Sequence, residues 1–236
     1  MPSSTTSGAD PRRTFHELVD PTELAPEFLH AVRHVKLRGA RAIVNLALGE
    51  LPRFRRVPEA ALRGVLSFST SLDHLERAYD DAKHGEVSRR LHLEATLPSL
   101  TTAGLAPEGK HVMSVAVQYV PYHLKGGRWD EAAKSALADR VIAALGDHAP
   151  DLAGSVLGRA VYTPLDLEER FGLTEGHLYG GELTLDQILF MRPVPGFAHY
   201  RTPIENLFLC GEACHPGGAL PGLAGAIAAR EILKEI

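Results

Sequence analysis

The sequence predicts an α+β protein: a mixed or antiparallel sheet covered by helices, followed by a separate strand, loop and helix at the carboxyl end. Two observations carry this prediction. Apolar residues recur at helical spacing in some segments and at every second position in others. The chain also has 236 residues, of which 44% are hydrophobic, enough for one large core or two small ones.

The amino-terminal residues differ in character from the rest of the chain. Residues 1–12, which begin "MPSSTTSGADP", are polar and lack the basic and apolar regions of a secretory signal, so we expect a disordered tail. The following "PTELAPEFLHAVRHVK" places apolar residues at helical spacing after Thr22, a residue type that caps helices. A helix is therefore predicted over 22–36.

Four segments between residues 41 and 122 have the alternation expected of strands: "RAIVNLALGELP", "GVLSFS", "RLHLEATLPS" and "HVMSVAVQYVPY". Their alternate polar positions indicate one wetted face, and antiparallel pairing follows. Among them, "SLDHLERAYDDAKHG" predicts a helix capped by Ser71 and ended by Gly85.

The second half of the chain contains two further helix signals. "RWDEAAKSALADRVIAALGDHAP" repeats apolar residues at four-residue steps from Trp129 and stops at Gly146. "TPLDLEERFG" offers Thr163 as cap and Pro164 at the first helical position. Residues 176–203 are rich in Gly, Pro, Tyr and Arg, which favours a long ordered excursion over a surface or around a ligand.

The composition of the chain indicates which classes of binding partner and which cellular location to expect. The formal charge is −4 and no block of five like charges occurs, so nucleic-acid binding is not expected. The longest uncharged run, residues 213–229, contains two prolines and four glycines, and no integral membrane segment is expected. Two cysteines cannot form a disulfide framework and are compatible with a reducing compartment, so we expect a cytoplasmic protein.

The segment "NLFLCGEACHPGGALPG", residues 206–222, allows three interpretations. A structural metal site wants four ligands, and only Cys210, Cys214 and His215 are close in sequence, so no metal is predicted. A redox dithiol usually has two intervening residues, whereas three lie here, and Glu212 among them would raise the thiol pKa. Neither interpretation is favoured.

The third interpretation is a loop whose backbone holds a cofactor. A strand leads into Gly211, glycines follow that leave space for a ligand, and a helix begins near Pro221. Along that helix, four small residues share one face: Gly222, Gly225, Ala226 and Ala229. Spacing alone leaves two explanations for this face, close packing on a sheet or close approach of a ligand.

At its carboxyl end, "LTLDQILFMRPVPGFAHYRTPIENLFLCGEACHPGGALPG" resembles the phytoene-desaturase-like FAD-dependent oxidoreductases, in the branch of the pyridine nucleotide-disulfide oxidoreductase domain-containing protein 2 group and within the wider amine oxidase superfamily. The resemblance extends through "TPLDLEERFGLTEGHLYGGELTLDQ", "VQYVPY" and "NLALGELPRF" to "GADPRRTFHELVD". It covers nearly the whole chain.

This resemblance implies FAD as cofactor and a set of binding positions. The strand, loop and helix would close over the flavin, with Glu212 accepting a hydrogen bond from a ribityl hydroxyl. The implied positions are Gly211, Glu212, Gly217, Gly218, Ala219, Leu220 and Gly222. It also implies a substrate-binding-type α+β domain over residues 13–203 and an FAD-binding strand, loop and helix over residues 204–236.

Two departures from the family pattern limit what the resemblance implies. The family commonly ends in a Gly-Arg-Asn stretch, where this chain has Gly225-Ala226-Ile227, and Pro221 removes an amide donor. No G-x-G-x-x-G occurs in the 236 residues, so the dinucleotide-binding half is expected to be missing. We therefore expect a fragment of an FAD-dependent oxidoreductase that oxidises an apolar or amine-like small molecule and is inactive alone. The alternative is a cofactor-free binding or assembly module.

The sequence pattern identifies no side chain as a catalytic acid, base or nucleophile. His199 and His215 lie near the loop in sequence, but histidines in turns are usually structural. Arg192 and Arg201 could contact the cofactor, although surface ion pairs are the expected role. The nearby aromatic residues are expected to pin the excursion to the core or to line an apolar pocket: Tyr179, Phe190, Phe197 and Tyr200.

Overall fold

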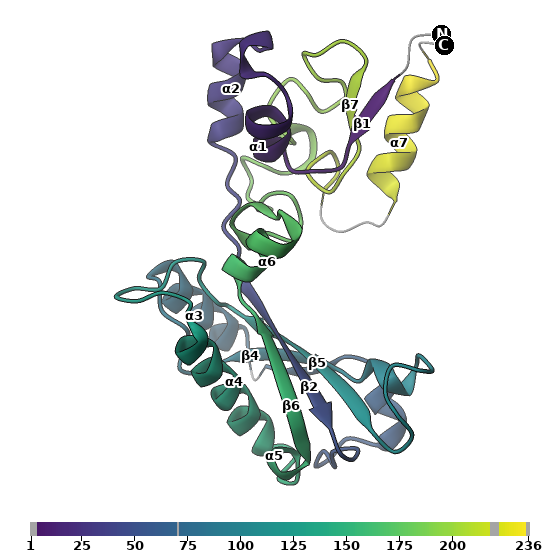
Figure 1. The fold of residues 1–236 in the computed structure, drawn as a ribbon. Coiled ribbons are helices and arrows are strands. Elements are labelled where there is room, and N and C mark those ends of the chain that lie inside the picture. Colours follow the sequence, from purple (N-terminus) through teal and green to yellow (C-terminus); the bar gives the residue numbers. More distant parts are fainter. Residues whose placement is uncertain (1–3, 70, 218–221, 235–236) are drawn as a thin grey trace. The chain divides into compact units, whose positions relative to one another are not determined.

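The computed structural model describes residues 4–69, 71–217 and 222–234. The chain divides into two compact units (Figure 1). Unit 1 combines residues 1–39 with residues 167–236, and unit 2 is the intervening stretch, residues 40–166. Each unit has its own cluster of buried apolar side chains.

Unit 2 is built on a five-stranded antiparallel sheet with the strand order β3-β4-β5-β2-β6. The strands are β2 (Arg41–Leu48), β3 (Leu66–Phe68), β4 (His92–Thr96), β5 (His111–Gln118) and β6 (Val156–Tyr162). Strand β2, between β5 and β6, buries Ala42, Val44, Leu46 and Leu48, while the residues between them stay half-buried or exposed. This alternation gives the sheet one core face.

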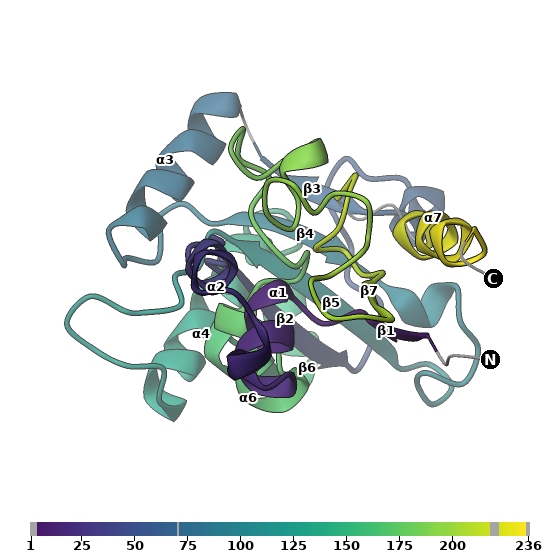
Figure 2. The same ribbon diagram turned by 90° about the horizontal axis from the view of Figure 1, so that it is seen from above.

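Helix α4 (Glu131–Gly146) covers that core face and runs along the sheet (Figures 1 and 2). Its buried side chains belong to the same apolar cluster as those of the strands: Leu137, Ala138, Val141 and Leu145. The other helices of this part of the chain are α3 (Leu72–Lys83) and α5 (Leu152–Ser155), with short 3₁₀ turns at Glu59–Arg63 and Pro98–Leu100. Helix α6 (Pro164–Phe171) crosses the boundary at residue 166.

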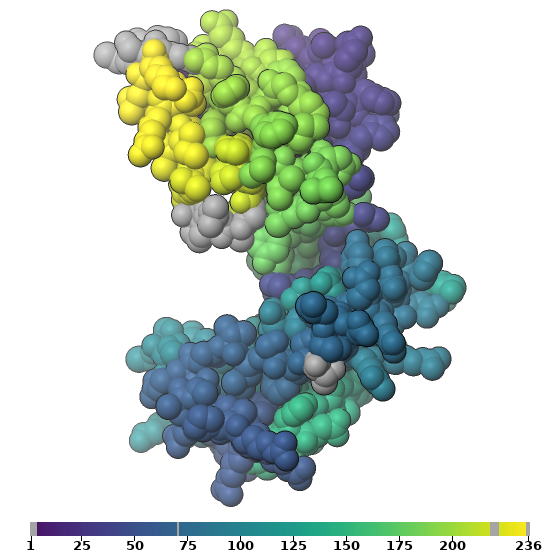
Figure 3. All heavy atoms as spheres, turned by 180° about the vertical axis from the view of Figure 1, so that it is seen from behind, coloured from purple at the N-terminus to yellow at the C-terminus, as the bar shows by residue number. Residues whose placement is uncertain are grey.

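Unit 1 has a much smaller sheet. Strand β1 (Thr5–Ser7) pairs in parallel with β7 (Leu207–Leu209), and α7 (Leu223–Ile232) follows the loop after β7. The space-filling view shows α7 at the surface of this unit (Figure 3). The remaining helices are α1 (Pro11–Arg13), a π-helical turn at Thr14–Leu18 and α2 (Pro26–Arg33), with 3₁₀ turns at Pro21–Glu23, Thr174–Gly176 and Leu189–Met191. Buried apolar residues of both sequence segments form one core.

The predicted α+β class is confirmed, and so are most of its elements. All four predicted strands before residue 122 form and pair antiparallel. Helix α3 begins after Ser71, whose hydroxyl accepts a hydrogen bond from the His74 amide at 3.2 Å. Trp129 precedes α4 rather than lying in it, because Asp130 caps the helix by accepting from the Ala133 amide at 2.9 Å.

Two expectations differ from the structure, and one strand was not predicted. Residues 5–7, expected to be disordered with the rest of residues 1–12, form β1, because they pair with a strand at the other end of the chain. The helix expected from Thr22 begins at Pro26, after a separate turn that Asp20 stabilises by accepting from the Thr22 amide. Strand β6, with Gly158 and Arg159 in its middle, was not predicted.

The compact units also divide the chain differently from the expected domains, residues 13–203 and 204–236. The unit boundaries lie at residues 39/40 and 166/167, so unit 1 contains both chain ends. The pairing of β1 with β7 explains this division, because it joins segments that local sequence patterns cannot relate.

Candidate functional site

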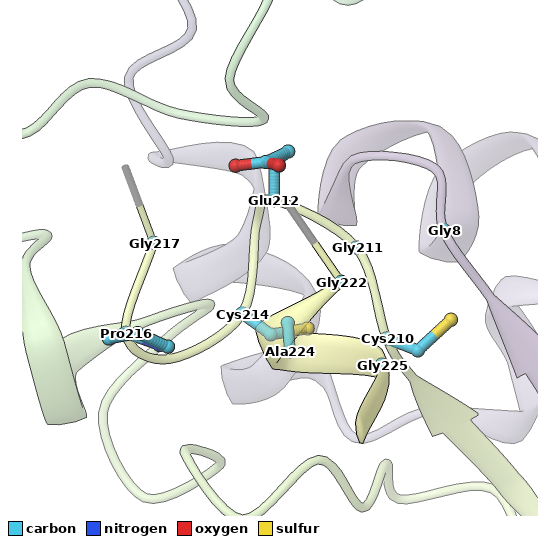
Figure 4. Close-up of a pocket in the computed structure, with 10 residues that line it drawn as sticks. All are labelled: Gly8, Cys210, Gly211, Glu212, Cys214, Pro216, Gly217, Gly222, Ala224 and Gly225. Carbon is cyan, nitrogen blue, oxygen red and sulfur yellow. The ribbon is translucent and has the colours of Figure 1, made fainter. Parts of the chain in front are cut away.

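A recess of about 220 Å³ lies in unit 1, where the chain leaves β1 and β7 at their carboxyl ends (Figure 4). In open sheets of parallel strands, ligands bind at this end. The residues that line the recess come from the β1–α1 connection, the loop after β7 and the start of α7: Gly8, Cys210, Gly211, Glu212, Cys214, Pro216, Gly217, Gly222, Ala224 and Gly225.

Backbone contact between the ends of the two strands forms one wall of the recess. The Cys210 amide donates to the Ser7 carbonyl at 2.9 Å, which continues the β1–β7 ladder beyond β7. At the next residue, a Cβ on Gly211 would lie 2.3 Å from the carbonyl oxygen of Gly8. Gly211 is therefore required by this close approach, whatever the recess binds.

Arg192 supports the far side of the same loop. Arg192 is 2% exposed, and its guanidinium donates to the carbonyl oxygens of several residues at 3.0–3.3 Å: Tyr179, Gly181, Glu182, Gln187 and Glu212. A Cβ on Gly217, whose φ is +76°, would lie 2.6 Å from the Arg192 Nε. Burial lowers the pKa of Arg192, and nearby Cys214 and Glu212 act in the opposite direction. The carbonyl dipoles stabilise this buried cation.

The third wall is the beginning of α7. Gly222 precedes the helix in the left-handed conformation, with φ at +77°, and no side chain of the described residues caps the helix there. Ala224 and Gly225, in its first turn, line the recess. The free amide groups and the positive end of the helix dipole stabilise negative charge on a ligand at this position.

Four of the predicted site residues line this recess together: Gly211, Glu212, Gly217 and Gly222. The other three, Gly218, Ala219 and Leu220, lie outside the described residues. Gly8 lines the recess but was missed by the sequence analysis, because it lies about 200 residues from the loop and no local motif connects the two. The sequence signals for it are the family resemblance of "GADPRRTFHELVD", which begins at Gly8, and its position directly after a short segment of threonine and serine.

The two cysteines do not resemble a reactive pair. Cys214 is 1% exposed, and burial raises its pKa to about 12, so the thiol is protonated at neutral pH. Figure 4 shows the Cys210 sulfur pointing away from Cys214, and that sulfur lies 3.6 Å from the Ser7 carbonyl oxygen. Among residues 4–69, 71–217 and 222–234, no three His, Cys, Asp or Glu side chains are grouped to hold a metal ion.

The other candidate side chains have structural contacts. The expectation of a surface ion pair for Arg192 is wrong, since its guanidinium is buried among carbonyl groups. Tyr200, 3% exposed, donates to the His215 carbonyl at 2.7 Å and pins the excursion to the core, as expected. Arg201 lies over the Phe208 ring at 5.9 Å. His199 and His215 are not among the residues that line the recess.

Within the part of the chain that the structure describes, no helix has the length and apolar character needed to cross a bilayer. The recess is lined by five glycines, by Ala224 and Pro216, by the two cysteines and by Glu212. Such walls suit a ligand that is planar or carries hydroxyl groups.

Comparison with known proteins finds longer relatives for nearly the whole chain. It is 38% identical over 239 aligned residues to the rat protein named pyridine nucleotide-disulfide oxidoreductase domain-containing protein 2, and 37% identical to the mouse protein of that name. Each alignment covers 98% of this chain and 41% of the relative. No family model matches the chain.

A more distant relative carries a more specific name. The lycopene-forming phytoene desaturase of Pantoea ananas is 31% identical over 146 residues, which cover 61% of this chain and 28% of that enzyme. The chain thus spans less than half the length of each of these relatives.

Proposed function

We propose a function for this chain from the premise that it belongs, as a partial-length relative, to the family of pyridine nucleotide-disulfide oxidoreductase domain-containing protein 2. The recess in unit 1 binds part of an FAD cofactor, and the chain contributes to an FAD-dependent oxidoreductase. The observation that carries this proposal is the position of a glycine-lined recess at the carboxyl ends of two parallel strands, beside a helix amino terminus.

The size of the recess limits how much cofactor it takes. Small-molecule sites usually enclose about 300–1,000 Å³, whereas this recess measures about 220 Å³. FAD is a large dinucleotide, so the recess accommodates only a part of it. The remaining contacts come from a dinucleotide-binding segment outside this chain, in keeping with the greater length of the relatives.

Different residues of the recess make different contacts with the cofactor. Gly211, Gly217 and Gly222 keep side chains out of the recess, and the Glu212 carboxylate accepts a hydrogen bond from a ligand hydroxyl. The start of α7 stabilises negative charge on the ligand. When bound, the flavin supplies the hydride acceptor for oxidising an apolar or amine-like small molecule. No side chain of this chain is assigned a catalytic role.

The proposal is tested by flavin retention. The purified chain is incubated with excess FAD and desalted, alone and mixed with the separately produced part of the rat relative that it does not match, and the absorbance spectrum is recorded. We expect flavin bands in the mixture. Bands in neither sample contradict the proposal.

A matched pair of carboxyl variants refines this test. Glu212→Gln should weaken FAD binding about tenfold, because a charge-assisted hydrogen bond to a hydroxyl is lost. Glu205→Gln serves as the control, since Glu205 is an exposed carboxylate near the same loop that does not line the recess. Equal loss in both variants would assign the effect to net charge rather than to the recess.

A second candidate is a cofactor-free binding module. The segment 183–190 exposes four large apolar side chains: Leu183, Leu185, Leu189 and Phe190. Clusters of this kind mark interaction surfaces. This candidate predicts that the chain associates with the same partner polypeptide in the absence of flavin and that Leu185→Asn, at a side chain 92% exposed, weakens the association. Light scattering with and without FAD separates the two functions.

A further inference from the structure

Two histidines lie together on the exposed side of helix α2 in unit 1 (Figure 1). His30 is in the last turn of the helix, and His34 is its carboxyl-terminal cap. Both residues are exposed, whereas Phe28 and Val32 of the same helix are buried in the core. Because an α-helix repeats every 3.6 residues, residues four apart are neighbours on its surface. The two imidazoles are therefore neighbours on the side of α2 that faces away from the core.

This arrangement occurs once in the sequence. The chain has 12 histidines, and His30 and His34 are the only two that are four residues apart. Their ring centroids are 4.3 Å apart, with an angle of 44° between the ring planes. The rings are close enough for a single ion to contact a nitrogen of each.

A hydrogen bond determines which nitrogen His34 offers to a ligand. Its Nδ1 lies 2.8 Å from the carbonyl oxygen of His30. A carbonyl only accepts, so Nδ1 carries the hydrogen and Nε2 of the neutral ring has the free lone pair. In metal sites, a ligating histidine almost always donates its other ring hydrogen to a carbonyl, a carboxylate or water. The ring of His34 is held in the same way.

The separation of the two rings indicates the coordination geometry that suits them. Imidazole nitrogens bind divalent ions at about 2.0–2.1 Å. Two rings on one ion then have centroids about 4.5 Å apart at a right angle and about 5 Å apart at a tetrahedral angle. The observed 4.3 Å is closer to the right angle, which copper and nickel adopt in tetragonal sites.

We propose that His30 and His34 together bind a divalent transition-metal ion on the surface of α2, through one ring nitrogen of each. Imidazole is a preferred ligand of copper, nickel and zinc, and two histidines at this spacing on one helix bind zinc in the H-E-x-x-H motif. Among the described residues, no group of three His, Cys, Asp or Glu side chains could hold a metal ion. Water therefore fills the remaining coordination positions. This site is separate from the recess and does not depend on flavin binding.

The proposal is tested by titrating the purified chain with Ni²⁺ in a calorimeter, which gives the stoichiometry and the dissociation constant. His30→Gln and His34→Gln each remove one ligand. His84→Gln is the matched control, because His84 is likewise an exposed cap at the carboxyl end of a helix, α3, and the residue four positions before it is Asp80. The thermal midpoint of each variant is measured without metal.

We expect the original chain to bind one Ni²⁺ with a dissociation constant in the micromolar range. His30→Gln and His34→Gln should each weaken binding by about tenfold or more, because the second ring acts at a high effective concentration once the first is bound. His84→Gln should bind as the original chain does. All three side chains are exposed, so the midpoints without metal should stay within about 2 °C of the original.

A second measurement locates the ion. Substoichiometric Cu²⁺, which is paramagnetic, should broaden the amide NMR signals of residues 28–36 first and leave those of α3 sharp. Cu²⁺ should also bind more tightly than Zn²⁺. Broadening centred on Cys210 or on another histidine would overturn the proposal. An equal loss of affinity in His84→Gln, or no Ni²⁺ binding below about 1 mM in the original chain, would overturn it as well. Since no flavin is present, none of these outcomes bears on the proposed FAD site.

Discussion

Different kinds of interaction stabilise the interior of unit 1 and the interior of unit 2. Unit 2 has five antiparallel strands and a long helix whose apolar side chains interdigitate in one core. Unit 1 has two parallel strands of three residues each, a smaller apolar core and the buried Arg192 guanidinium, which holds three backbone segments together through their carbonyl groups.

The two units differ in how regular their stabilising interactions are. Parallel pairs are found mainly in larger sheets that are covered on both faces, and a two-stranded sheet is marginal by itself. Unit 1 instead combines irregular backbone, glycines and a buried charge around a recess. Such features lower stability where they occur and are typical of binding sites. Unit 2 has the regular alternation of an antiparallel sheet with one buried face.

The largest expected effect separates the two units directly. Arg192→Met should destabilise unit 1 by about 4 kcal/mol or more, because five carbonyl groups, two of them on buried residues, lose their donor. Hydrogen exchange should rise across residues 179–192 and the loop after β7, while the strands of unit 2 keep their protection. Arg192→Lys keeps the charge but fewer of the hydrogen bonds. It should destabilise unit 1 less than Arg192→Met does. Uniform loss of protection in both units would refute this separation.

Truncation of a core side chain in unit 2 should have the opposite effect, with hydrogen-exchange protection lost in unit 2 and kept in unit 1. The loss of stability should be slightly smaller. Leu46→Ala in β2 removes a fully buried side chain and should destabilise unit 2 by about 3 kcal/mol. Leu157→Ala in β6 is the matched control, because that leucine is 65% exposed, and it should change stability by less than about 0.5 kcal/mol. Urea unfolding followed at Trp129, the single tryptophan and a member of the unit 2 core, gives both values.

The smallest effect is a pH dependence that isolates one side chain of unit 1. The Nδ1 of His177 accepts hydrogen bonds from the amides of Tyr179 and Gly181, each at 3.2 Å. Burial lowers the pKa of His177 below the unfolded value of 6.5. Since the unfolded chain then binds a proton more readily than the folded one, His177 contributes its full stability above about pH 6.5 and loses it as pH falls through the folded-state pKa.

The check is a variant that cannot titrate. His177→Asn keeps an acceptor near the two amides and should flatten the decline of the unit 1 transition between neutral and acidic pH. Burial also lowers the pKa of His92 in unit 2, so that unit should keep its own decline in the variant. If the variant and the original chain lose stability in parallel, the imidazole of His177 is not responsible.

Local patterns in the sequence were sufficient for α3, α4 and the antiparallel strands. Ser71 caps α3 as its position predicts, and the alternation in β2 correctly separates the buried from the half-exposed residues. The segment after β7 was also recognisable, because Gly211, Glu212 and Gly217 are close in sequence and line one recess. Strand β6 was missed because its pattern is interrupted by Gly158 and because its pairing with β2 supplies the stabilisation that its own residues lack.

The sequence by itself determined the elements whose stability is local: apolar periodicity, caps and glycine turns act over a few residues and are visible in any short window. Only the tertiary structure decided that Gly8 joins the recess and that Arg192 is buried. The position of Gly8 depends on the pairing of β1 with β7, whose neighbouring residues Ser7 and Cys210 are 203 positions apart. Pairing at that separation is fixed by the packing of the whole unit, because the entropy of closing so long a loop is offset only by many contacts formed together.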